Sequence, residues 1–218
     1  MRFLRHSSAR GSVFSCMLVV VATALVGSMV LSACSPSDRD RSGDQDRGPV
    51  FAVDPEDLGE PYTNEALGIT FSPPRDWMLL EDDTRERIME ALRGEAEGAQ
   101  LIDVFFSTET LSFAVLQRPT DEAGRLLSIQ ECDELLAATL TPGDDPAGVT
   151  ASERTEFGVN NLHVIHYRHV VADRIGATLL FTGTDGDAIL LQYSIPAAEI
   201  DAELRKVESS IGTLRRIR

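Results

Sequence analysis

Hydrophobic positions divide the chain into three parts with different periodicities. A nearly continuous apolar run covers residues 12–31, the polar stretch 35–61 has no apolar period, and alternating patterns begin near residue 62. An apolar run after basic residues is typical of a signal sequence or a membrane anchor, and a polar stretch without periodicity is typical of a linker. The third part predicts one folded domain over residues 62–218.

The domain has the pattern of a sheet whose strands follow one another through short turns. Two short extended pieces are predicted first, at 66–71 and 77–80. The longer predicted strands are 101–106, 111–117, 151–157, 161–171, 175–182 and 188–195. The Asp-Gly pair at 185–186 predicts a hairpin turn between the last two of them.

Three amphipathic segments predict helices beside this sheet. The first runs from Asp82 to about Leu92, the second opens with a capping box from Ser128 to Glu131, and the third spans about 197–211. Sequential hairpins imply antiparallel pairing, and the helices must cover the faces of the sheet. We therefore expect an α+β fold, an α-β-α sandwich around a mainly antiparallel sheet of about six strands with three helices.

The N-terminal apolar run ends in a lipobox, the processing motif of bacterial lipoproteins. Leu31, Ser32, Ala33 and Cys34 supply the aliphatic residue, the two small residues and the cysteine that lipoprotein signal peptidase needs, because the thiol is first alkylated by diacylglycerol. The run is also long enough to span a bilayer, so an uncleaved anchor is the alternative. We predict a signal peptide over 1–33 and lipidation of Cys34.

Lipidation would place the domain on the extracytoplasmic side of a membrane in the cell envelope. Each buried acyl CH₂ contributes ~0.8 kcal/mol, so a diacylglyceryl group holds a protein firmly to the bilayer. Ser35, the next residue, permits export to an outer membrane in a cell that has one. Residues 34–61 alternate in charge and contain frequent Pro and Gly, which predicts a disordered charged tether.

Charge and cysteine content narrow the function classes. The chain has 20 basic and 35 acidic residues, for a net charge of −15, and loss of Arg2, Arg5 and Arg10 with the signal peptide would leave −18. Such a surface repels nucleic acid, so no nucleic-acid partner is expected.

Of the three cysteines in the chain, Cys16 lies in the predicted signal peptide and Cys34 is the predicted lipidation site. Only Cys132 remains, so the mature chain cannot form an intramolecular disulfide.

Three histidines at a spacing of three residues are the first candidates for chemistry. His163, His166 and His169 stand in a segment rich in β-branched residues, which predicts a strand rather than a helix. Side chains alternate along a strand, so His166 would face away from the other two, which would themselves lie ~20 Å apart. We expect ordinary strand positions and no metal site.

The remaining candidates also favour structural roles. Asp185-Gly186-Asp187 and Asp144-Asp145 lack the longer series of oxygen ligands of an EF-hand, so we interpret the former as a turn. Cys132 lies on the apolar face of a predicted helix, where a small buried thiol is expected. The chain has no G-x-S-x-G, S-x-x-K or glycine-rich phosphate loop. We therefore predict no catalytic residues and no cofactor.

Four aromatic residues near the tether could line a peptide-binding groove. They are Phe51, Tyr62, Phe71 and Trp77. Phe71 and Trp77 fall on a predicted strand and extended piece, so we expect these two in the core.

Two segments resemble a known family. Residues 67–77, L-G-I-T-F-S-P-P-R-D-W, resemble the start of PsbP/Mog1-like domains, and residues 209–214, S-S-I-G-T-L, resemble their end. Bacterial lipoproteins of the LpqN-like and DcrB-like groups share this layout. The resemblance covers about 62–214 and implies an α-β-α sandwich used as a binding or assembly module. It implies no shared catalytic set, so no functional residue is carried over from it.

Three function classes stay open at this point. We favour a lipid-anchored extracytoplasmic accessory or binding module without a catalytic site, which supports an envelope protein or complex. Its expected partners are the membrane, through the lipid on Cys34, and an envelope protein. The alternatives are a carrier of a small ligand and an envelope hydrolase that uses Cys132 or the histidines.

Overall fold

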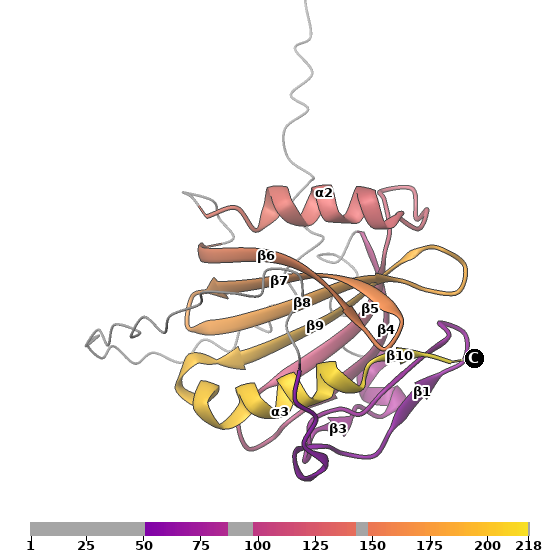
Figure 1. Cartoon of the computed structure of the whole chain (residues 1–218). Coiled ribbons are helices and arrows are strands. Elements are labelled where there is room, and N and C mark those ends of the chain that lie inside the picture. Colours follow the sequence, from indigo (N-terminus) through magenta and orange to yellow (C-terminus); the bar gives the residue numbers. More distant parts are fainter. Residues whose placement is uncertain (1–50, 87–97, 143–147, 218) are drawn as a thin grey trace, which may run out of the picture.

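A seven-stranded antiparallel sheet forms the centre of the computed structural model, which describes residues 51–86, 98–142 and 148–217 (Figure 1). The strand order is β3-β4-β5-β9-β8-β7-β6, and every pairing is antiparallel. The strands are β3 (Met78–Leu79), β4 (Ala99–Phe106), β5 (Phe113–Pro119), β6 (Val149–Val159), β7 (Leu162–Val171), β8 (Arg174–Thr182) and β9 (Ala188–Pro196). This confirms the predicted antiparallel sheet, with β3 as a seventh, two-residue strand.

A second, smaller sheet and the helices complete the described fold. The small sheet has the order β1-β2-β10, with β1 (Tyr62–Asn64), β2 (Ile69–Phe71) and β10 (Arg215–Arg216). The helices are η1 (Pro55–Asp57), α2 (Ile129–Thr139), η2 (Ala197–Glu199) and α3 (Ile200–Thr213). Residues 82–86 are helical, as predicted for the start of the first helix, and the rest of that helix lies outside the described residues.

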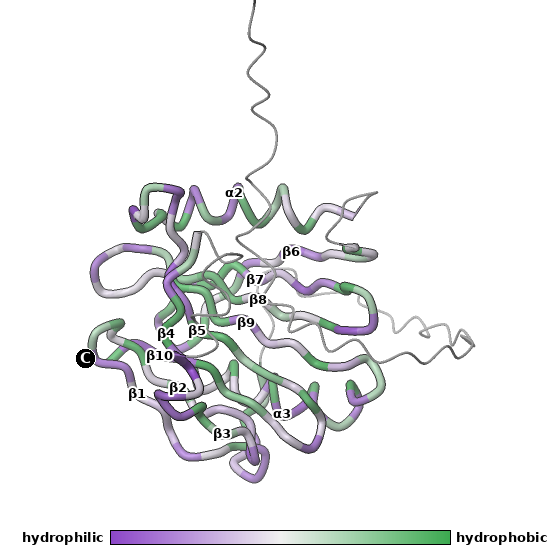
Figure 2. Tube along the Cα trace, turned by 180° about the vertical axis from the view of Figure 1, so that it is seen from behind, coloured by the Kyte–Doolittle hydropathy of each residue, from purple (hydrophilic) through white to green (hydrophobic). Residues whose placement is uncertain are grey.

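The two faces of the large sheet pack against different layers. On β8, Leu179 and Phe181 belong to a core cluster shared with α3 and β2, whereas Leu180 between them belongs to a second cluster shared with α2. This alternation buries apolar side chains on both faces, and Figure 2 shows the hydrophobic residues concentrated on the central strands. The predicted α-β-α sandwich is therefore confirmed.

The folded part begins earlier than the sequence indicated. The sequence predicts a tether over residues 34–61, but the ring of Phe51 packs 4.9 Å from the ring of Phe157, and the backbone N–H of Asp54 donates to Ser209 on α3 at 3.2 Å. Asp57 accepts two hydrogen bonds from Arg205, also on α3. We call residues 51–58 the strap. Their polar composition predicts a linker, because the residues that they contact on α3 stand about 150 positions later in the chain.

Local turn and capping predictions agree with the structure. Ser128 and Glu131 form the capping box at the start of α2. Gly186 has φ +86° in the hairpin between β8 and β9, a conformation that glycine adopts without strain. The β6–β7 hairpin closes through Asn160 and Asn161, both with positive φ, which is typical of a two-residue type I′ turn.

Candidate functional site

Strand β6 is the end strand of the large sheet and pairs only with β7 among the described residues (Figure 1). It is 11 residues long, whereas the strand at the opposite end of the sheet, β3, has two. An end strand presents a row of unpaired N–H and C=O groups, which is a ready template for another strand. This free edge of β6 is the candidate functional site.

The β6–β7 turn determines which residues point their backbone groups outward. Val159 and Leu162 close the two-residue turn, so they exchange both hydrogen bonds, and such pairs alternate with non-bonded pairs along the ladder. The non-bonded positions of the β6–β7 pair therefore include Ser152, Arg154 and Glu156 of β6. Their N–H and C=O groups therefore point toward the free edge.

A network of charged side chains flanks this edge on the α2 side. The guanidinium of Arg154 donates to both carboxylate oxygens of Asp133 on α2, at 3.0 and 2.8 Å, and lies 2.7 Å from a carboxylate oxygen of Glu156. The Tyr167 hydroxyl donates to the same Asp133 carboxylate at 2.5 Å. His163 Nε2 is 3.2 Å from Glu156 Oε2.

The network holds its members in their ordinary charge states. Hydrogen bonds from Arg154 lower the pKa values of Asp133 and Glu156, and the bond to Asp133 raises the pKa of Arg154. Burial raises the pKa of Tyr167 to about 12. Each group is thereby stabilised as an anion, a cation or a neutral phenol at neutral pH. Such a network fixes α2 over β6 and β7.

The structure does not bring the three predicted histidines together. They lie on β7 as expected, with His163 mostly exposed, while the His166 ring packs 5.9 Å from Phe157 on the opposite face. His169 lies over Gly176 of β8, so closely that an added Cβ would stand 2.1 Å from its Nε2. Burial lowers the pKa values of His166 and His169. In the described part of the chain, no group of three or more His, Cys, Asp or Glu side chains could hold a metal ion.

The candidate nucleophile of the hydrolase hypothesis is inside the core. Cys132 is 1 % exposed and belongs to the cluster of α2, together with Leu136 and Leu180. A buried thiol among apolar side chains is disfavoured as a thiolate, which is the reactive form. The structure therefore agrees with the predicted core position of Cys132.

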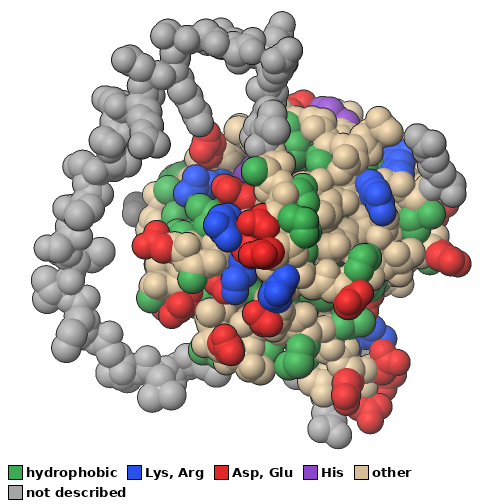
Figure 3. All heavy atoms as spheres, turned by 60° about the horizontal axis from the view of Figure 1, so that its bottom comes forward, with side chains coloured by type: hydrophobic (Ala, Val, Ile, Leu, Met, Phe, Trp, Pro, Cys, Tyr) green, Lys and Arg blue, Asp and Glu red, His purple; other side chains and the backbone are tan. Residues whose placement is uncertain are grey.

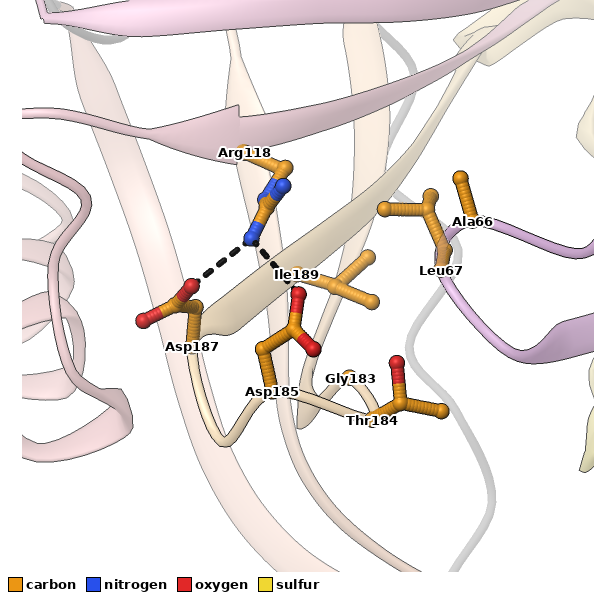
Figure 4. Close-up of a pocket in the computed structure, with 8 residues that line it drawn as sticks. All are labelled: Ala66, Leu67, Arg118, Gly183, Thr184, Asp185, Asp187 and Ile189. Carbon is orange, nitrogen blue, oxygen red and sulfur yellow. Dashed lines mark hydrogen bonds and ion pairs between the residues drawn. The ribbon is translucent and has the colours of Figure 1, made fainter.

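The Asp185-Gly186-Asp187 segment forms the β8–β9 turn, as predicted, and Asp144-Asp145 lies outside the described residues. Arg118 on β5 holds the turn through Asp187 at 2.7 Å and Asp185 at 3.7 Å (Figure 4). A small depression lies between this turn and residues 66–67. It is too narrow to admit a water molecule, so it offers no room for a carried ligand.

The four aromatic residues at the start of the domain lie in the core or pack against it. Phe71 and Trp77 are in the core, as expected, and Phe51 and Tyr62 are half-buried against the same cluster. The Tyr62 hydroxyl donates to the carboxylate of Asp103 on β4, and burial raises the pKa of Tyr62.

Besides Asp57 of the strap, two further buried carboxylates with defined partners were not predicted from the sequence. Asp103 interrupts the apolar strand L-I-D-V-F-F and binds Arg85 as well as Tyr62. Glu203 stands on the buried face of α3 and binds Trp77 and Lys206. An acid at an apolar position of a strand or helix is the pattern that could have revealed both.

The surface around α3 and the strap carries charges of both signs. Figure 3 shows acidic and basic side chains intermixed on this side of the molecule. Arg205 pairs with Asp57 at 2.8 Å and with Asp54 at 3.6 Å. Arg205 therefore helps to hold the strap against α3.

The predicted lipobox, Leu31 to Cys34, lies outside the described residues. Within residues 51–86, 98–142 and 148–217, no helix is both long enough and apolar enough to cross a membrane. Lipidation and the location that it implies stay predictions.

No protein-family model matches the sequence, and no curated protein matches it either. Several solved structures are similar in their arrangement of elements, and three of them follow. Cyanobacterial PsbP (CyanoP) from Synechocystis sp. PCC 6803 has 13 % identity and a TM-score of 0.43, over 78 % of this chain and 99 % of that one. LpqN, a protein involved in cell envelope biogenesis of Mycobacterium tuberculosis, has 13 % identity and a TM-score of 0.43, over 76 % and 87 %.

The third similar structure is a protein from Bacteroides thetaiotaomicron VPI-5482. It has 12 % identity and a TM-score of 0.41 over 74 % of this chain, which spans about half (49 %) of that protein. A PsbP and LpqN, both named in the predicted resemblance, are thus among the structures similar to this one. At this sequence identity and TM-score, the similarity does not indicate what this chain binds. It does not establish membership of a family either.

Proposed function

We propose that this chain is a lipid-anchored extracytoplasmic binding module, which docks an extended segment of a protein partner on the free edge of β6. The lipid on Cys34 would hold it to the membrane of the cell envelope. Residues 35–50 would form the tether, since the domain is already packed at Phe51. The partner would add one strand to the large sheet.

The single observation that carries this proposal is the length and composition of the free edge. Strand addition takes its affinity from backbone hydrogen bonds and its specificity from side chains at alternate positions. On β6, three consecutive outward-facing residues, Ser152, Arg154 and Glu156, offer donors and acceptors beside a network of fixed charges. The network on α2 restricts which strand can lie there.

A photo-crosslinking amino acid placed on the edge tests the docking site. We would replace Glu156 with it in cells that produce the full chain, and replace Glu208 on α3, also exposed, as the matched control. The expected result is one discrete adduct from position 156 and none from position 208. No adduct at 156, with the protein present and folded, would overturn the proposal.

A proline on the edge supplies the second arm of this test. The N–H of Ser152 points outward, so Ser152→Pro should remove an edge donor without breaking the β6–β7 ladder. The adduct from position 156 should disappear in this variant, while circular dichroism of the purified chain stays unchanged. An adduct that persists at the same yield would show that the partner does not pair with the strand.

The anchor needs a test of its own. Cys34→Ala removes the thiol that the lipid would modify, so the chain should leave the membrane fraction. Incorporation of a labelled fatty acid should be lost together with it. Unchanged membrane association without label would favour the uncleaved anchor instead.

A further inference from the structure

We propose that the strand which docks on β6 is β6 of a second copy of this chain, paired antiparallel about Thr155. This inference rests on the proposed docking edge and names its occupant. It follows from the residues that a twofold pairing of this strand brings opposite one another.

The outward direction of the backbone groups restricts the allowed registers. In an antiparallel pair, two opposed residues either both exchange hydrogen bonds or both do not. On β6 the even-numbered residues from Ser152 to Gly158 point outward, so an even residue must oppose an even one. The twofold axis must therefore pass through a residue that opposes its own copy.

Charge selects one register from this set. Centring on Arg154 opposes two arginines, and centring on Glu153 or Glu156 opposes two glutamates; like charges directly opposite are destabilising. Centring on Thr155 instead places Arg154 opposite Glu156 of the second copy, twice across the axis. Thr155 then meets its own copy, and Thr–Thr pairs are favourable across strands.

The residues concerned are accessible at the surface, although they already have partners within their own chain. Arg154, Glu156 and Glu153 are exposed, and Thr155 is partly exposed on the opposite side of the strand from α2. Arg154 already lies 2.7 Å from Glu156 of its own strand. In the paired arrangement each guanidinium has a carboxylate beside it along the strand and another across the axis, so the charges alternate in sign.

Cysteine at the axis gives the sharpest test. Opposed residues of a non-bonded antiparallel pair have Cα atoms about 4.5 Å apart, within the range of a disulfide. Thr155→Cys in the full chain should therefore form a covalent dimer when membranes are treated with an oxidant. In Glu153→Cys the two cysteines would stand about 13 Å apart along the strands, so this matched control should stay monomeric. The wild-type chain reports any dimer formed through its own cysteines.

A charge exchange tests the selected register. Arg154→Glu should lower the crosslinking yield of Thr155→Cys at least tenfold, because four carboxylates would then meet at the axis. Adding Glu156→Arg to it restores opposite charges and should restore the yield. A yield that does not recover, in a chain whose circular dichroism is unchanged, would overturn the register.

The outcomes separate this inference from the proposed docking edge. No disulfide in folded Thr155→Cys, together with an adduct between position 156 and a different protein, overturns the second copy as occupant but leaves the docking edge in place. Absence of both the disulfide and the adduct overturns both proposals. Both proposals are supported if Thr155→Cys forms a disulfide while Glu153→Cys does not, and if the adduct from position 156 has twice the mass of the chain.

Discussion

The indole N–H of Trp77 donates a 2.9 Å hydrogen bond to the carboxylate of Glu203, which is 1 % exposed. The second oxygen of this carboxylate accepts from Lys206 at 3.0 Å. Glu203 lies on α3 and Trp77 just before β3, so the bond ties the helical layer to the start of the sheet. A buried carboxylate is tolerated here because both of its oxygens have donors.

Loss of the Trp77 donor should destabilise the domain. Trp77→Phe keeps a ring in the core but leaves one oxygen of Glu203 without a partner, and a hydrogen bond to a charged group contributes roughly 1.5–3 kcal/mol. We expect the free energy of unfolding, measured by urea titration with far-UV circular dichroism, to fall by at least that amount. Adding Glu203→Leu should recover part of the loss, because no buried carboxylate then remains unpaired. Additive losses in the double variant would contradict this explanation.

Gly176 should determine the position of the His169 ring. An added Cβ would stand 2.1 Å from its Nε2, so Gly176→Ala must push the ring off the sheet. Burial lowers the pKa of His169 in the native chain, and a displaced ring should titrate nearer its ordinary value of about 6.5. NMR titration of the histidine Cε1 protons measures this rise. Gly158→Ala, where an added Cβ meets nothing nearer than 3.9 Å, is the matched control and should leave it unchanged.

The capping box of α2 should lose its contribution only in strong acid. The hydrogen bond from Arg125 is the main cause that lowers the pKa of Glu131 from 4.5 to about 2. Because the folded pKa is depressed, the stabilisation is present above about pH 4.5 and is lost as the pH falls toward 2. Arg125→Ala should raise the Glu131 pKa, as followed by NMR of its side-chain carboxyl carbon. Arg154→Ala, which acts on Asp133 instead, should not; an equal effect of both variants would contradict the assignment.

A larger side chain at position 212 of α3 should release the strap from this helix. A Cβ at Gly212 would lie 2.7 Å from a methyl of Val53 and 3.3 Å from the carbonyl oxygen of Phe51. Gly212→Val should displace these residues and increase several-fold the rate at which a glutamate-specific protease cuts at Glu56. Gly158→Val on β6 is the control and should leave that rate unchanged. Equal rates in Gly212→Val and the native chain would show that the strap is not held there.

Local patterns in the sequence were sufficient for much of the fold. The capping box from Ser128 to Glu131 and the Asp-Gly turn at 185–186 involve residues within a few positions of one another, so their geometry is written in short segments. β-Branched neighbours predict a strand for the histidines, and the helical spacing of apolar residues predicts a core position for Cys132, which are again local patterns.

The candidate site on β6 could not be predicted from such local patterns. That β6 is an end strand depends on the order of all seven strands, and periodicity gives the same pattern for an edge as for an interior strand. The network around Arg154 needs Asp133, which is 21 residues earlier and on another element. An acidic residue in a polar segment, such as Asp57, likewise looks like part of a linker until Arg205 stands beside it.

The periodicities, the turns, the caps and the position of the lipobox motif follow from the sequence alone, since each is a property of neighbouring residues, and the net charge follows from the composition. The assembled fold is needed to show which strand lies at the edge, where the strap docks, and which donors meet Asp103 and Glu203. These depend on contacts between residues as far as 157 positions apart, and such contacts form only when the whole sheet and its two covering layers are assembled.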